Sequence, residues 1–143
     1  MLKIAIFLVF GVVLTVFSAT TSLAQKRSLP PRAIKFVIET TGERFVVATS
    51  NKTIISKARK ELSLPRDQRT LFFSGAIAEG NSGHNQPWSW HAVPNNWDLV
   101  EISMELCDGR PSGVESNLKL WLRIGRFCPW ASRVVAELPR FSR

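Results

Sequence analysis

The spacing of apolar residues constrains the fold of this chain more than any other feature. In "AIKFVIE", residues 33–39, apolar side chains alternate with polar ones, and this period of two is typical of a half-buried strand. The next four residues, "TTGE", have the composition of a tight turn, and Gly42 can adopt a positive φ there. The following "RFVVATS" supplies a partner strand. The sequence therefore predicts a β-hairpin over residues 33–49.

The period then becomes helical over residues 51–62, "NKTIISKARKEL". At 100° per residue one side of this segment is apolar and the other is basic, with Ser50 as a candidate cap and Pro65 beyond the end. The basic face has two interpretations: a contact for anionic surfaces, or simply a solvated helix face.

The rest of the chain continues both periods. Residues 70–78 predict another strand, with Gly75 as a possible bulge. Residues 98–107 alternate as a strand would, which directs one set of apolar side chains into the core: Val100, Ile102, Met104 and Leu106. Residues 111–125 predict a second helix, opened by Ser112 and Glu115 at capping-box spacing. We expect an α+β fold, an antiparallel sheet with two helices packed on one side.

The amino terminus has the organisation of a secretory signal peptide. A short positive start precedes an apolar run over residues 4–17, and small residues lead to Ala24. The run is short for a bilayer span, although an uncleaved anchor is the alternative interpretation. We expect a signal peptide over residues 1–24, a flexible leader over 25–32 and a single domain over 33–143. The mature protein would be secreted or periplasmic, without stable membrane anchoring.

Cys107 and Cys128 are the only cysteines. In an exported protein such a pair is most simply a disulfide. A two-cysteine metal site is the alternative, but zinc prefers four ligands and neither cysteine belongs to a C-x-x-C pair.

Charge is distributed unevenly along the chain, whose formal net charge is +8. Residues 71–109 contain five acidic and no basic side chains, between two basic flanks. The flanks could attract anionic polymers or only keep the protein soluble. The central segment offers nothing to contact phosphate, so we expect no nucleic acid there.

No recognised catalytic motif is present. The sequence lacks G-x-S-x-G, H-E-x-x-H, a P-loop, G-x-G-x-x-G and an EF-hand loop. Two histidines and nearby carboxylates could form an acid–base or metal cluster: His84, His91, Asp98, Glu101 and Glu105. Because the two histidines leave zinc two ligands short, we expect no metal and no other cofactor.

Three distinctive motifs point to a family. They are "PWSWH" at 87–91, "ELCDG" at 105–109 and "CPW" at 128–130. The chain from about 33 to 137 resembles a domain of small secreted bacterial proteins that also forms the amino terminus of a slime-mould calmodulin-binding protein. The resemblance implies a common fold unit but supplies neither an activity nor binding residues. An exported protein would not meet cytoplasmic calmodulin.

The segment 80–97 is the candidate site, because it holds both histidines and three of the five tryptophans. One interpretation assigns its rings to the core, and we expect Trp90 and Trp121 to be buried. In the other, the rings form an apolar wall beside amide and imidazole groups, which suits an extracellular carbohydrate, peptide or protein. The candidate ligand-binding residues, expected nearer the surface, are His84, Asn85, Trp88 and His91.

We therefore expect a binding module rather than an enzyme. Two alternatives remain: an inhibitor-type protein that acts through the loop 80–86, and a small hydrolase that uses the histidines with Glu101 or Glu105.

Overall fold

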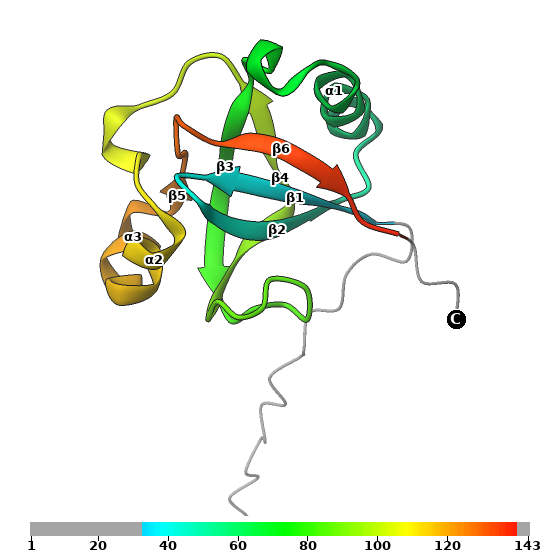
Figure 1. Ribbon diagram of the computed structural model, residues 1–143. Helices are drawn as coiled ribbons and strands as arrows, with labels where there is room; N and C mark the ends of the chain where they lie inside the picture. Colours follow the sequence, from blue (N-terminus) through cyan, green and yellow to red (C-terminus); the bar gives the residue numbers. More distant parts are fainter. Residues whose placement is uncertain (1–32, 140–143) are drawn as a thin grey trace, which may run out of the picture.

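The computed structural model describes residues 33–139 (Figure 1). The expected signal peptide and leader lie outside the described residues. Six strands, three α-helices and two 3₁₀ turns follow in the order β1 Ile34–Thr40, β2 Glu43–Thr49, α1 Lys52–Ser63, η1 Arg66–Gln68, β3 Phe72–Glu79, β4 Trp90–Val100, η2 Glu105–Cys107, α2 Pro111–Ser116, α3 Leu118–Ile124, β5 Arg126–Phe127 and β6 Arg133–Glu137. The α+β class is confirmed.

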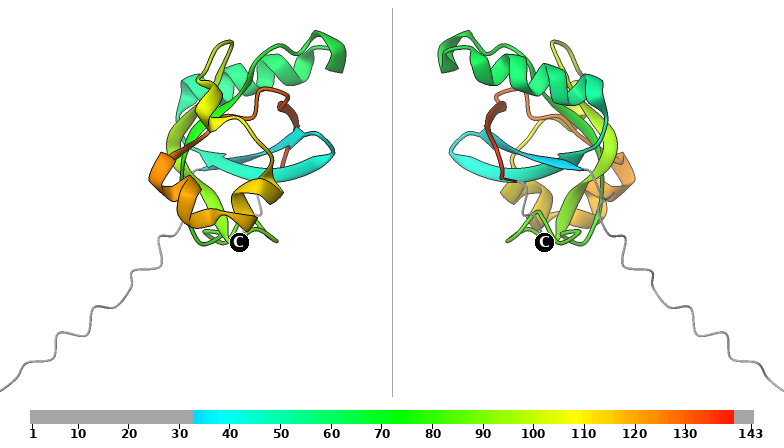
Figure 2. Two further views of the ribbon diagram at one scale, coloured as in Figure 1. Left: turned by 90° about the vertical axis from the view of Figure 1, so that its left-hand side faces the viewer. Right: turned by 90° about the vertical axis from the view of Figure 1, so that its right-hand side faces the viewer.

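The strands form two antiparallel sheets of three, with the orders β2-β1-β6 and β4-β3-β5. The sheets face each other, and their strands cross in Figure 1. Helix α1 lies at one end of this sandwich, and α2 and α3 lie at the other (Figures 1 and 2). The expected single sheet is thus divided in two, because β6 returns to pair with β1 instead of extending the sheet of β3 and β4.

The core fills the space between the two sheets and is rich in aromatic rings. Phe45 of β2 contacts three rings of the opposite sheet, those of Phe73, Trp90 and Phe127, at centroid distances of 5.1, 5.6 and 5.6 Å. All four side chains are buried. Because a large ring buries about 150–250 Å² of surface, these contacts account for much of the core of a domain this small.

The predicted hairpin over residues 33–49 is confirmed, with Thr41 and Gly42 at positive φ in its turn. Helix α1 also lies where it was expected, but Asn51 rather than Ser50 caps it. The Asn51 side chain accepts hydrogen bonds from the backbone N–H groups of Thr53 and Ile54. The bulge expected near Gly75 is present too, since the β3–β4 register shifts between Gly75 and Ile77.

The predicted strand over residues 98–107 is wrong. β4 begins earlier, at Trp90, and ends at Val100, opposite Phe72 at the start of β3. Leu99 is the core residue at this end of β4, so the inward face is the opposite of the one predicted. Beyond Val100 the chain has no strand to pair with, and the apolar residues at 102, 104 and 106 are exposed.

The predicted helix over residues 111–125 is two short helices separated at Asn117, whose φ of −132° and ψ of 38° are not helical. Gly125 ends α3 at a φ of 74°. The capping box does not form. The Ser112 N–H and hydroxyl instead donate to Glu43, and the Ser89 N–H and hydroxyl donate to Glu115, so both residues bind other segments.

The disulfide between Cys107 and Cys128 is confirmed, with Cα atoms 5.1 Å apart. It joins η2 to the segment between β5 and β6, and the Cys128 N–H also donates to the Cys107 carbonyl. The chain that follows β4 is therefore fixed at Cys107.

Candidate functional site

The loop between β3 and β4, residues 80–89, contains most of the predicted site residues. It is closed by a hydrogen bond from the Gly80 N–H to the Ser89 carbonyl. Inside it, the Asn81 carbonyl accepts from the N–H groups of His84 and Asn85. The loop is thus folded on itself by its own backbone rather than extended for contact.

Asn85 is fully buried and connects the two sheets. Its Oδ1 accepts from the Val46 N–H of β2 at 2.7 Å, and its Nδ2 donates to the Trp90 carbonyl of β4 at 2.9 Å. Buried backbone groups need such partners, and this amide supplies one of each kind. The expectation that Asn85 lies near the surface is wrong, because its hydrogen-bonding capacity is used inside the fold.

The two histidines lie next to each other, with ring centroids 6.0 Å apart in an edge-on arrangement. Each Nδ1 is within hydrogen-bonding distance of a backbone carbonyl, that of Ser82 for His84 and that of Gly80 for His91. Both rings are buried, so the expectation that they lie nearer the surface is wrong. Burial lowers the pKa of His84, and the neighbouring His91 and Lys35 add to this effect. The neutral imidazole is therefore the favoured form in the fold.

The structure does not bring these histidines together with the carboxylates that the hydrolase hypothesis requires. His91 pairs with Ala78 near the end of β3, whereas Val100, which precedes Glu101, pairs with Phe72 at the start of β3. Six residues of strand separate the two positions, or about 20 Å at the usual rise of a strand. Within residues 33–139 no three His, Cys, Asp or Glu side chains are grouped so as to hold a metal ion.

The tryptophans of the segment are mainly structural. Trp90 and Trp97 are buried, as expected for Trp90. Trp88 is half-buried against Trp90, and its Nε1 donates to the Arg44 carbonyl at 2.8 Å. Trp121 was expected to be buried; it is half-buried, edge-on to Phe127. No flat ring in this loop is fully presented to solvent.

The basic face of α1 is partly neutralised within the fold. Lys57 pairs with Asp98 at 2.6 Å, and Arg59 makes two hydrogen bonds of 2.8 Å to Glu137. Lys52 and Lys60 remain exposed. Two of the four cations that could have formed a contact for anionic surfaces are thus engaged by the domain itself. In the part of the chain that the structure describes, no helix is long and apolar enough to cross a membrane.

A different surface carries the exposed apolar side chains. Between β4 and η2, Ile102 is 86 % exposed, Met104 57 % and Leu106 70 %. Leu120 on α3 and Trp130 after β5 are also largely exposed, and together these are the exposed large hydrophobic side chains of residues 33–139. All five belong to segments on one side of the molecule, the left in Figure 1, which faces the viewer in the left view of Figure 2. We name this set, Ile102, Met104, Leu106, Leu120 and Trp130, the apolar face.

The chain that carries most of the apolar face, residues 101–107, is held in place along its length. It leaves β4 at Val100 and ends at the disulfide of Cys107. Midway, the Ser103 hydroxyl lies 3.4 Å from that of Ser74. At its far end Asp108 accepts from the Trp130 N–H at 2.9 Å, which joins the segment to the remaining part of the face.

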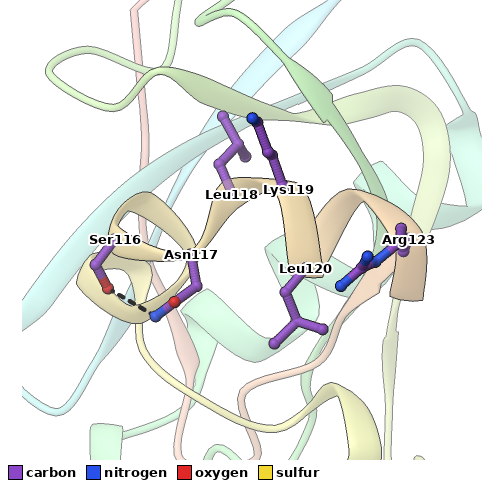
Figure 3. A pocket seen from close by; sticks show the side chains of 6 residues that line it. All are labelled: Ser116, Asn117, Leu118, Lys119, Leu120 and Arg123. Atoms are coloured by element: carbon purple, nitrogen blue, oxygen red, sulfur yellow. Dashed lines mark hydrogen bonds between the residues drawn. The ribbon is translucent and has the colours of Figure 1, made fainter.

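Next to this segment, the turn between α2 and α3 has an open hollow of about 480 Å³ (Figure 3). Its lining combines apolar, basic and uncharged polar side chains: Ser116, Asn117, Leu118, Lys119, Leu120 and Arg123. Asn117 donates to the Ser116 hydroxyl at its rim. The hollow thus lies beside the apolar face and shares Leu120 with it.

A comparison with protein families identifies the domain. The family described as the BP-74 N-terminal domain matches residues 32–141. The chain belongs to this family. No curated protein and no solved structure matches the chain. The resemblance seen in the sequence is therefore confirmed, over almost the same residues.

In this member of the family the sequence motifs serve the fold. The "PWSWH" motif holds the loop 80–89 against β2 and the core through Trp88 and Trp90, together with Asn85 just before it. The "ELCDG" and "CPW" motifs supply the disulfide and the bond between Asp108 and Trp130. The sequence interpretation missed the apolar face, because its alternating residues at 102, 104 and 106 are equally typical of a buried strand.

Proposed function

We propose that this chain is an extracellular protein-interaction module that binds its partner through the apolar face. The observation that carries the proposal is the clustering of the exposed large apolar side chains of residues 33–139 on one side. Scattered apolar residues are normal on a surface, but a contiguous patch is typical of an interface.

The geometry favours a protein over a carbohydrate as ligand. A sugar ring is best held by an apolar wall with a few placed polar groups beside it. The rings and amides of the loop 80–89 are turned inward, and the apolar face is made mainly of aliphatic side chains. Ile, Leu and Met side chains adapt to the apolar groove of a protein partner. The site is thereby moved from His84, Asn85, Trp88 and His91 to the segment 101–107.

The inhibitor-type hypothesis is retained in altered form. A segment that is fixed at both ends loses little conformational freedom on binding, which favours affinity. Residues 101–107 meet this condition through β4 and the disulfide, and they present apolar side chains outward. The loop 80–86, the earlier candidate, has its central amide buried.

A capture experiment tests the proposal. Wild-type protein, the variant Ile102→Ser/Met104→Ser/Leu106→Ser and the control variant Lys52→Ser/Lys60→Ser are immobilised and exposed to the extracellular proteins of the producing organism. Proteins retained by wild type and control, but not by the triple variant, are the expected result. Equal retention by all three would rule out the apolar face as the binding surface.

Met104 allows the same surface to be observed directly. It is the only methionine among residues 33–139 and is more than half exposed. Exposed methionine is oxidised to the sulfoxide by peroxide. We expect a bound partner to slow the oxidation of Met104, as measured by peptide mass spectrometry. An unchanged rate in the presence of a saturating partner would place that partner elsewhere.

A further inference from the structure

We propose that a partner of the apolar face is a second copy of this chain, with residues 101–106 of each copy seated in the α2–α3 hollow of the other. The inference rests on the proposed function, because it uses the same face. It adds the identity of the partner and the register of the contact.

The charges of the two surfaces are opposite and unused. Glu101 and Glu105 flank the exposed apolar residues of the segment, and Lys119 and Arg123 line the hollow. None of these four takes part in an ion pair within residues 33–139. The acidic groups that form ion pairs within the described domain are others, namely Glu39, Asp98 and Glu137. Charges left unpaired on two facing surfaces favour a specific orientation between copies.

The apolar parts also correspond. The segment projects aliphatic side chains at 102, 104 and 106, and the hollow presents Leu118 and Leu120 between its cationic groups. Figure 3 shows Leu120 on the other side of α3 from Leu118 and Lys119, so the apolar lining extends around the helix. A hollow of about 480 Å³ is of the size that holds a small group of side chains.

The placement of the two surfaces is compatible with a closed dimer. The segment 101–107 and helices α2 and α3 lie on the same side of the molecule (Figure 2, left view). Under a two-fold axis through that side, the segment of one copy meets the hollow of the other, and the reverse contact forms at the same time. Each copy then contributes both partners of the contact, and the dimer covers the exposed apolar residues of both.

Paired charge reversals test this arrangement. Glu101→Lys/Glu105→Lys puts like charges on both surfaces, and so does Lys119→Glu/Arg123→Glu. In a mixture of the two variants every contact again joins opposite charges, either reversed on both sides or wild type on both sides. Self-association is measured by sedimentation velocity from about 1 µM to 1 mM, a range that covers weak dimers.

We expect a concentration-dependent dimer for wild type, at least about tenfold weaker association for each variant alone, and recovery in the equimolar mixture. The control Lys52→Glu/Lys60→Glu changes charge on α1, away from the contact, and should leave the dimer intact. Slower oxidation of Met104 at the higher concentrations should accompany dimer formation.

Wild type that stays monomeric up to about 1 mM overturns the inference, and so does a dimer that neither reversal weakens. A failure here is distinguishable from failure of the proposed function. If the chain is monomeric but the triple serine variant still loses captured proteins, the apolar face binds another protein and only the second copy is wrong.

Discussion

The buried amide of Asn85 distinguishes a structural loop from a binding loop. Replacing it by alanine removes the acceptor for the Val46 N–H and the donor to the Trp90 carbonyl. Both backbone groups would be left in a region from which the fold excludes water, and the space vacated by the amide is too enclosed to be filled from the surface, since Asn85 has no exposed area.

The magnitude follows from these two bonds. A buried donor or acceptor that loses its partner costs about 1–3 kcal/mol. Two such groups, one on each sheet, give about 2–6 kcal/mol for Asn85→Ala. Because typical domains are stable by only about 5–15 kcal/mol, the variant should be close to the limit of folding.

Denaturant unfolding measures the effect, and Asn81→Ala is the matched control. Asn81 lies in the same loop, but its side chain accepts only from the Gly83 N–H near solvent. We expect a loss below about 1 kcal/mol for the control, typical of one exposed hydrogen bond. Equal and small losses for both variants would refute the structural role of Asn85 and restore it as a surface group.

Four further predictions concern stability. Trp90→Ala should lower the free energy of unfolding by about 3–5 kcal/mol, because the ring is fully buried between the sheets. Gly75→Ala should cost about 1–3 kcal/mol, because the added Cβ would lie 2.4 Å from the Cβ of Trp97. Reduction of the disulfide, whose cysteines are 21 residues apart, should cost about 3 kcal/mol, seen as a lower denaturation midpoint with dithiothreitol. Burial lowers the pKa of His84, so its contribution is complete above about pH 6.5 and is lost as the pH falls through the folded-state pKa. His84→Gln should therefore flatten the fall in stability between about pH 7 and pH 5, and an unchanged slope would contradict this.

Local sequence signals predicted the elements that depend on local rules. The hairpin was visible because its alternation and its turn residues agree, and α1 because its apolar stripe and flanking residues agree. The disulfide followed from the presence of two cysteines and no third. These signals act over a few residues, so one sequence contains them in full.

The errors occurred where long-range contacts decide the structure. Ser112 and Glu115 have capping-box spacing, but each finds a partner from another segment, Glu43 and Ser89 respectively. Asn85 is of a residue type usually found at surfaces, and it is buried because it satisfies two strands of different sheets. Neither contact can be inferred from spacing along the chain.

The segment 98–107 shows why alternation alone does not identify a core strand. A strand buries its apolar face only if a neighbouring strand extends as far, and β3 begins at Phe72, opposite Val100. Beyond that point Cys107 must reach Cys128, so the chain leaves the sheet and turns into η2. Its apolar side chains then have no partner within the described domain. Exposing three large apolar residues in succession is unfavourable for a monomer, and the disulfide prevents the segment from folding back over the core. An alternating apolar run that ends in a constrained cysteine is therefore better interpreted as a candidate docking segment than as a strand.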